Sequence, residues 1–145
     1  MTDTAAFPPA TCAAIGAFMA SQGLSSDALR ADGRLTLVID GTWRIHLQPA
    51  SHDRVAITSQ LLSLTGVWHP AGLDRVLEPL AQKAAGMLRQ YASGLCLDER
   101  RQALLLQQFV PATADAVAVE DALAEFVNAL AFWRPVCAAQ AFSAA

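Results

Sequence analysis

The side chains best suited to metal or acid–base chemistry in this sequence are its three histidines and three cysteines. The histidines are His46, His52 and His69, and they fall in a strand-like segment, the turn after it and a later loop. No HxxxH, HxH or CxxC spacing occurs, so a metal site would need ligands from separate elements. An odd number of widely spaced cysteines among apolar neighbours favours buried, reduced thiols over disulfides or zinc ligands. These cysteines are Cys12, Cys96 and Cys137.

The sequence also lacks the motifs of nucleophilic catalysis and phosphate binding. Serines such as Ser63 and Ser93 stand in no motif that would supply a base and an orienting group. Neither GxGxxG nor GxxxxGK(S/T) is present. The acidic pair Asp98-Glu99 is followed at once by Arg100-Arg101, which favours a solvated turn over two catalytic carboxylates. We therefore predict a protein that is not an enzyme and has no cofactor or metal.

Composition narrows the class of partner. The chain has 145 residues, of which 54% are hydrophobic and only 16% charged, so it is apolar enough to hide surface in an oligomer or against a partner. The net charge is −3 and no basic cluster occurs, which argues against nucleic acid. No apolar run approaches the ~18 residues of a membrane span, and the N-terminus lacks a basic signal-peptide region. We expect a cytoplasmic protein without nucleic-acid or membrane partners.

Helical spacing of apolar residues predicts three helices. The first is short, follows Pro8-Pro9 and ends before Gly23, with an apolar stripe of Ala14, Ile15, Phe18 and Met19. The second spans residues 73–92 and the third about 115–139. Pro79 lies inside the second, where we expect a kink near Glu78, and Pro135 is expected to kink or end the third.

Period-two alternation predicts five strands. Residues 34–48 form a hairpin whose Asp40-Gly41 favours a type I′ turn, and residues 54–64 add a third strand. A loop over 65–72 precedes the second helix, and residues 94–111 form a second hairpin. The order is α-β-β-β-α-β-β-α, an α+β fold in which one twisted antiparallel sheet packs with three helices. We expect a single domain over residues 1–145, with residues 1–8 disordered.

The last strand raises the question of a partner. Ala103, Leu105 and Phe109 point to one side of it, whereas Leu104, Leu106 and Val110 point to the other. A strand with one face in water should alternate more cleanly between apolar and polar residues. The second face is therefore covered either by this chain or by another molecule.

The element order and three segments resemble the class I type III secretion chaperones of the Tir-chaperone (CesT-like) type. The segments are GRLTLVIDGTWRIHL, GLCLDERRQALLLQQFVP and LAEFVNALAFWRPVC, the last with Phe126 and Trp133 at the spacing of the family's final helix. The resemblance covers nearly the whole chain from Ile15 onward. It implies a homodimer that binds the N-terminal region of one or a few secreted effectors and keeps it soluble, partly unfolded and secretion-competent. It also implies delivery to the secretion apparatus, with the secretion ATPase as a further partner.

The resemblance assigns residues to two surfaces. The effector-binding candidates are Ile15, Phe18, Met19, Val38, Trp43, Ile45, Leu47, Leu104 and Leu106, although Ile45 and Leu47 could equally be core. The dimer-interface candidates are Leu73, Val76, Leu77, Leu80, Ala84, Met87, Leu88, Leu95 and Leu97. On this assignment Phe18→Asp would abolish partner binding and leave the fold intact.

Two other functions remain open at this stage. One is a regulatory subunit that uses the same apolar surface to bind a component of the secretion apparatus or a transcription factor. The other is a small-ligand-binding or enzymatic α+β dimer with a pocket near His46 and His69, in which His46→Ala would remove ligand binding.

Overall fold

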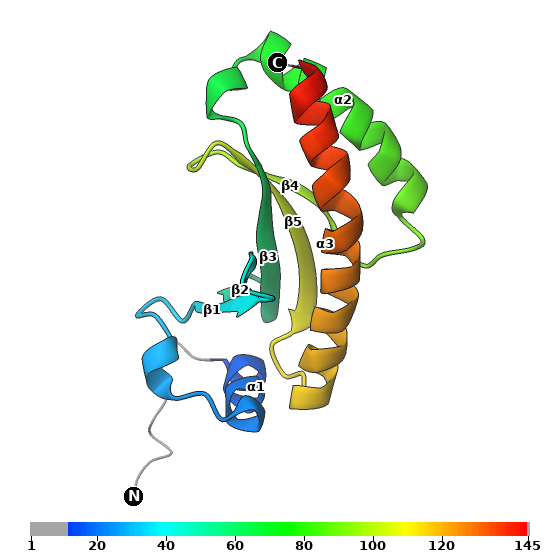
Figure 1. The fold of residues 1–145 in the computed structure, drawn as a ribbon. Coiled ribbons are helices and arrows are strands. Elements are labelled where there is room, and N and C mark those ends of the chain that lie inside the picture. Colours follow the sequence, from blue (N-terminus) through cyan, green and yellow to red (C-terminus); the bar gives the residue numbers. More distant parts are fainter. Residues whose placement is uncertain (1–11, 145) are drawn as a thin grey trace, which may run out of the picture. The chain divides into compact units, whose positions relative to one another are not determined.

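The computed structural model describes the backbone of residues 12–144 and the side chains up to Gln140. The segment 1–8, which we expected to be disordered, lies outside the described residues. Along the chain the structure has the following elements (Figure 1): α1 (Ala13–Gln22), η2 (Ser26–Ala28), β1 (Leu35–Ile39), β2 (Trp43–Ala50), β3 (Arg54–Ser63), η3 (Thr65–Val67), α2 (Pro70–Met87), β4 (Gly94–Asp98), β5 (Ala103–Pro111) and α3 (Ala116–Ala144). The predicted α+β class and element order are confirmed.

The five strands form one antiparallel sheet in the order β1-β2-β3-β5-β4. The Asp40-Gly41 turn has the positive φ angles of a type I′ turn, 54° and 67°, and Thr42 N donates to Ile39 O. Two backbone hydrogen bonds flank the β3–β5 pair, from Ala112 N to Asp53 O and from Leu64 N to Gln102 O. One end of β3 thus lies beside the opposite end of β5, as in an antiparallel pair.

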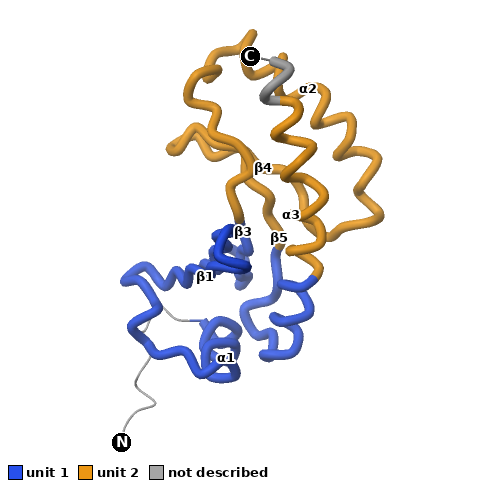
Figure 2. Tube along the Cα trace, viewed as in Figure 1, with its two compact units in different colours: residues 1–58, 109–124 blue, residues 59–108, 125–145 orange. Residues whose placement is uncertain are grey.

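The chain forms two compact units (Figure 2). Unit 1 comprises residues 1–58 and 109–124, and unit 2 comprises residues 59–108 and 125–145. Strands β3 and β5 and helix α3 each contribute to both units. The expectation of a single domain stays a prediction.

Unit 1 has its core on one face of the sheet. In β1–β3 the buried residues of this face are Leu35, Ile45, Leu47, Val55 and Ile57. Helix α1 adds Ala14, Ile15, Phe18 and Met19, and the start of α3 adds Val119 and Leu123. Helix α1 ends at Gly23, whose φ of 69° is the left-handed conformation that glycine adopts without strain. The predicted apolar stripe of α1 is therefore buried.

Backbone and side-chain hydrogen bonds hold α1 in unit 1. Ala14 N donates to Ala112 O at 2.9 Å, at the connection between β5 and α3. At the other end of the helix, the Ser21 hydroxyl and the Gln22 amide donate to Glu120 Oε2 at 3.2 and 3.3 Å. Helix α1 is thus attached at its start to the β5–α3 connection and at its end to α3.

Unit 2 packs α2 and most of α3 with the β4–β5 hairpin. Its core includes Val76 and Leu80 of α2, Leu104 and Leu106 of β5, and Phe126, Leu130, Trp133 and Cys137 of α3. The Tyr91 and Phe132 rings lie 6.2 Å apart.

Pro79 of α2 cannot donate a backbone hydrogen bond to the carbonyl of Arg75, and Gln140 Nε2 of α3 donates to that carbonyl at 3.4 Å instead. A side chain of α3 thus satisfies the acceptor that the proline of α2 releases.

Three helix boundaries differ from the sequence prediction. Helix α2 begins at Pro70 because His69 caps it and proline is favoured in the first turn, and it ends at Met87, so Tyr91 lies beyond it. The predicted loop accordingly contains η3 and the first turn of α2. Helix α3 continues through Pro135 to Ala144, so the proline does not end it. Trp133 and Cys137 are buried on either side of Pro135, and their packing outweighs the single lost hydrogen bond.

The two glycines of α2 provide a matched test of the His69 cap at the start of this helix. The Gly72 N–H donates to His69 Nδ1, and a Cβ on Gly72 would lie 2.8 Å from the His69 ring and 2.7 Å from Val67 O. We expect Gly72→Ala to lower the free energy of unfolding by about 1–3 kcal/mol. A Cβ on Gly86 would have no neighbouring atom within 4 Å, so Gly86→Ala should raise the free energy of unfolding by up to about 1 kcal/mol. Urea unfolding of the two variants should give midpoint shifts of opposite sign, and equal shifts would contradict the proposed crowding at His69.

Burial of Cys137 predicts a pH dependence of stability. Burial raises the pKa of this thiol from 9.0 to about 11. Since the unfolded chain loses this proton first, the contribution of Cys137 to stability should be constant below pH 9 and fall as the pH rises from 9 to 11. Cys137→Ala should be less stable at pH 7 but should show a shallower fall over that range. Unfolding at fixed pH steps measures both slopes, and parallel slopes would show that Cys137 does not contribute.

Candidate partner-binding surfaces

One face of the sheet in unit 1 is open to solvent. We call it the open sheet face, and it consists of Thr36, Val38, Arg44, His46, Gln48, Ala50, Arg54, Ala56 and Thr58. All of these except Ala56 keep accessible surface. The most exposed apolar side chain is Val38, at 59%. On β5, Phe109 is 39% exposed and carries the Arg54 guanidinium over its ring. The second face of β5 thus remains accessible in unit 1.

Strand β1 is an edge of the sheet. Its first residue, Leu35, forms a bridge with Leu29, and Arg30 N donates to Arg34 O. Among the described residues no strand pairs with β1 beyond this point on its outer side. An edge strand presents backbone donors and acceptors to which an extended peptide can add. The outer edge of residues 36–39 is therefore a candidate docking edge beside Val38.

The structure buries seven of the nine predicted effector-binding residues. These are Ile15, Phe18, Met19, Ile45, Leu47, Leu104 and Leu106, whereas Val38 is exposed and Trp43 is partly exposed. Phe18 is only 5% exposed, so Phe18→Asp would place a carboxylate in the core and destabilise the fold, contrary to our expectation. A role in effector binding stays a prediction for all nine. Of these, Val38 is exposed on the open sheet face, whereas Trp43 lies on the opposite face, beside the buried Ile45.

Unit 2 has an apolar groove between α2 and β4, which we call the α2–β4 groove. It is lined by Leu77, Leu80, Ala81, Ala84, Met87, Leu88, Ser93, Gly94, Leu95, Cys96, Leu97, Leu104 and Trp133. Leu88 and Leu97 are 75% and 42% exposed, which is unusual for leucine side chains that lie together. The Ser93 hydroxyl is buried and has no hydrogen-bond partner among the described residues. The groove thus exposes apolar surface and an unsatisfied polar atom.

Most of the predicted dimer-interface residues line this groove. Leu77, Leu80, Ala84, Met87, Leu88, Leu95 and Leu97 belong to it, whereas Leu73 and Val76 do not. Val76 and Leu80 are buried in unit 2. The sequence interpretation missed Ala81, four residues after Leu77 on the same helix, and Trp133, which we assigned only to the final helix. The helical period would have identified Ala81, but no sequence signal places Trp133 at a groove.

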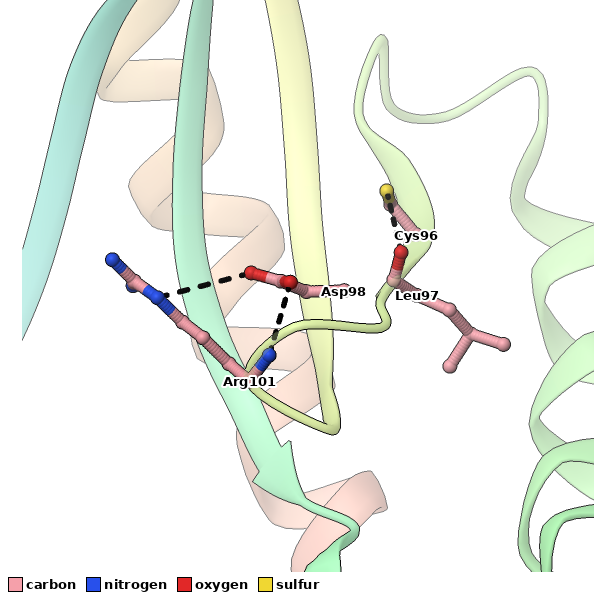
Figure 3. Close-up of polar contacts among 4 residues, drawn as sticks. All are labelled: Cys96, Leu97, Asp98 and Arg101. Carbon is pink, nitrogen blue, oxygen red and sulfur yellow. Dashed lines mark hydrogen bonds and ion pairs between the residues drawn. The ribbon is translucent and has the colours of Figure 1, made fainter. Parts of the chain in front are cut away.

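The tip of the β4–β5 hairpin is a charged, solvated turn (Figure 3). Asp98 accepts a hydrogen bond from Arg101 N at 3.2 Å and forms an ion pair with Arg101 Nε at 3.9 Å. The Cys96 thiol donates to Leu97 O at 3.7 Å. Burial and the Asp98 carboxylate both raise the pKa of Cys96, so its thiol is protonated at neutral pH. The turn is thus self-compensating, as its sequence predicts, and Cys96 is not an activated nucleophile.

The cysteines and histidines have local structural roles. All three cysteines are free, but only Cys137 is buried, since Cys12 and Cys96 are half-buried. His46 Nδ1 lies 2.9 Å from Thr36 Oγ1 on the open sheet face, and His69 caps α2. Within the described residues, no three His, Cys, Asp or Glu side chains are grouped closely enough to hold a metal ion. No described helix is long and apolar enough to cross a bilayer.

The sequence from residue 14 to residue 134 matches the Tir chaperone protein (CesT) family. The chain belongs to this family. The match extends from α1 to Arg134 of α3 and so includes residues of both units. The family consists of chaperones rather than enzymes, and the resemblance inferred from the sequence is confirmed. No sequence match was found among curated proteins.

Solved structures that include a chaperone–effector complex and a complex from a type III secretion system share this fold. The HopA1–SchA chaperone–effector complex matches with a TM-score of 0.61 and 19% identity, covering 81% of this chain and 88% of the other. The ExsC–ExsE complex gives the same score and identity, with coverages of 83% and 87%. The heterodimeric ExoU–SpcU complex from the type III secretion system of Pseudomonas aeruginosa gives 0.55 and 18%, with coverages of 81% and 93%. At these identities the similarity establishes the fold of this CesT-family chain.

Proposed function

We propose that this chain is a cytoplasmic type III secretion chaperone that binds the N-terminal region of one or a few effectors. In this role it keeps the bound segment soluble, partly unfolded and competent for secretion, and passes it to the secretion apparatus, with the secretion ATPase as a further partner. The family match over residues 14–134 is the observation that carries the proposal. Similar folds in chaperone–effector complexes support it.

The open sheet face and the outer edge of β1 suit an extended peptide. Backbone groups at an edge strand supply hydrogen bonds that do not depend on the peptide sequence, and side chains beside the edge supply selectivity. Val38 provides apolar contact next to the edge, on the open sheet face. A client that is held extended and unfolded needs this kind of surface rather than a closed pocket.

The α2–β4 groove suits a second copy of the chain. A two-fold interface buries the same patch on both subunits, so the apolar groove and protruding leucines of one subunit can pack against the same groove and leucines of the other. Leu88 and Leu97 would then be removed from water, and the Ser93 hydroxyl would gain a possible partner. We therefore propose a homodimer formed through unit 2 and effector binding through the open sheet face of unit 1.

Co-expression tests the function as a whole. The chain is expressed alone and then together with the open reading frames that neighbour its gene, and the products are analysed by size-exclusion chromatography with light scattering. We expect a dimer that captures the N-terminal region of a neighbouring gene product. Capture of a transcription factor or an apparatus component would favour the regulatory alternative, whereas a monomer that captures nothing would contradict both proposals.

The groove predicts which substitutions dissociate the dimer. Leu88→Asp or Leu97→Asp places a carboxylate in the apolar contact and should weaken dimerisation about tenfold or more. Both side chains are exposed in the single chain, so its circular dichroism should not change. Val117→Asp alters a valine that is 64% exposed in unit 1 and should leave the dimer intact. If both leucine variants remained dimeric, the groove would not be the interface.

The edge of β1 predicts a substitution that weakens client binding. Val38→Thr keeps the β-branched shape but replaces a methyl group by a hydroxyl, so a client packed on Val38 should bind about tenfold more weakly. Titration of a captured client segment, followed by fluorescence anisotropy, measures the change. Val117→Thr is the control, since it makes the same change at an exposed position on α3. Equal affinities of the wild type and Val38→Thr would place the client elsewhere.

A further inference from the structure

The charge on the open sheet face has the opposite sign to that of the whole chain. The chain has 13 acidic and 10 basic residues, with a net charge of −3. Strands β1, β2 and β3 nevertheless contain no Asp or Glu, whereas β2 contains Arg44 and β3 begins with Arg54. Both arginines lie on the open sheet face. In a negatively charged chain, the open sheet face thus contains two arginines and no carboxylate.

Arg54 is held in one orientation by two contacts within unit 1. Its Nε donates to Ser51 O at 3.0 Å. Its guanidinium carbon lies 3.8 Å from the centroid of the Phe109 ring, close enough for a cation–π contact. Because the side chain is already ordered, a ligand that binds it incurs little of the usual entropy cost of fixing an arginine.

Arg54 has no carboxylate partner in the described part of the chain. Arg101 pairs with Asp98 in unit 2, but no described carboxylate lies within 4 Å of the Arg54 guanidinium. A guanidinium has five N–H donors in a planar fork, and Ser51 O accepts from only one of them. The neighbouring positions on this face are small, since Arg54 pairs with Ala50 in the sheet and Ala56 follows two residues later. No long side chain at these positions separates the fork from an approaching ligand.

One ordered guanidinium beside an aromatic ring suits a carboxylate. The two outer nitrogens of the fork can bind both oxygens of an Asp or Glu, and the exposed part of Phe109 can pack on the adjoining methylenes. A phosphate dianion would favour a second cation close by, but Arg44 lies six positions along β2 from Ala50, or roughly 20 Å at the usual rise of a strand. The single fork therefore favours a monoanion.

We propose that Arg54 and Phe109 form a subsite that binds an acidic side chain of the effector segment lying on the open sheet face. The subsite rests on the proposed function and adds a preference to it: the client segment carries an Asp or Glu at a fixed distance from its apolar anchor residues. Selectivity for clients would then depend on charge as well as on apolar contact.

A random 15-residue peptide display library tests this preference without knowledge of the effector. The library is selected against the full-length wild type, Arg54→Gln and Arg30→Gln, the last of which makes the same charge change at an exposed arginine of unit 1. We expect the wild type and Arg30→Gln to enrich peptides with Asp or Glu at a fixed position. Arg54→Gln should lose this enrichment while still selecting apolar residues.

A double-mutant cycle on one selected peptide gives the strength of the contact. Replacing the peptide's acid by its amide should weaken binding to the wild type by about three- to tenfold and leave binding to Arg54→Gln unchanged. Arg54→Lys keeps the charge but loses the fork, and it should recover only part of the affinity. Circular dichroism of each variant confirms folding.

The outcomes separate this subsite from the proposed function. Equal acid enrichment by the wild type and Arg54→Gln, or an amide effect of the same size in both, would overturn the subsite and leave peptide binding intact. Failure of the wild type to select any peptide above background would contradict the subsite and the proposed chaperone function together.

Discussion

Burial of one face of the sheet is the constraint on which the rest of unit 1 depends. The register pairs Leu35 with Leu47 and Leu47 with Ile57, so three buried side chains from successive strands lie in one row. A slip of one residue would expose this row and bury polar residues such as Thr36 and His46 instead. The core therefore fixes the register, and the register in turn leaves the opposite face without a covering element. The surface available to a partner is thus a consequence of how the core is formed.

In unit 2 the helices α2 and α3 each contain a proline that interrupts their backbone hydrogen bonds. Pro79 removes one hydrogen bond from α2, and the resulting acceptor on Arg75 is satisfied by Gln140 of α3. Pro79 and Pro135 also line a common pocket with Lys83 and Gln140. The α2–β4 groove involves other residues of α2, from Leu77 to Leu88, and keeps its apolar lining. The prolines therefore cost the helices backbone bonds without removing the apolar surface that a second copy would need.

Most of the fold could be predicted from the sequence because local patterns determine it. Alternating residues and the Asp40-Gly41 turn gave the strands, and the apolar stripe ending at Gly23 gave α1. The start of α2 was missed because Pro70 and Gly72 are typical of loops, and only the His69 cap shows that they begin a helix. The surfaces were harder to predict, since burial depends on tertiary packing and an apolar residue such as Phe18 has the same sequence signal whether it faces the core or a partner. The stacked pair Arg54–Phe109 has no sequence signal, because its members lie far apart in the chain and meet only through the pairing of β3 with β5.

The contacts that the open sheet face offers limit how the protein can discriminate among clients. In the proposed complex, backbone pairing at β1 would be indifferent to sequence, and apolar contact at Val38 would accept any hydrophobic residue of suitable size. Selectivity then requires a polar group that would be left unsatisfied by the wrong partner. Arg54 meets this requirement in a particular way, because Ser51 O and Phe109 keep it ordered before any ligand arrives. A client without an acid would still pack on the open sheet face, but it would cover part of the guanidinium's hydration shell without replacing it. This kind of discrimination weakens the binding of a client that lacks the acid, and it does not require tighter binding of the right one. It is therefore compatible with loose, extended binding of the client backbone.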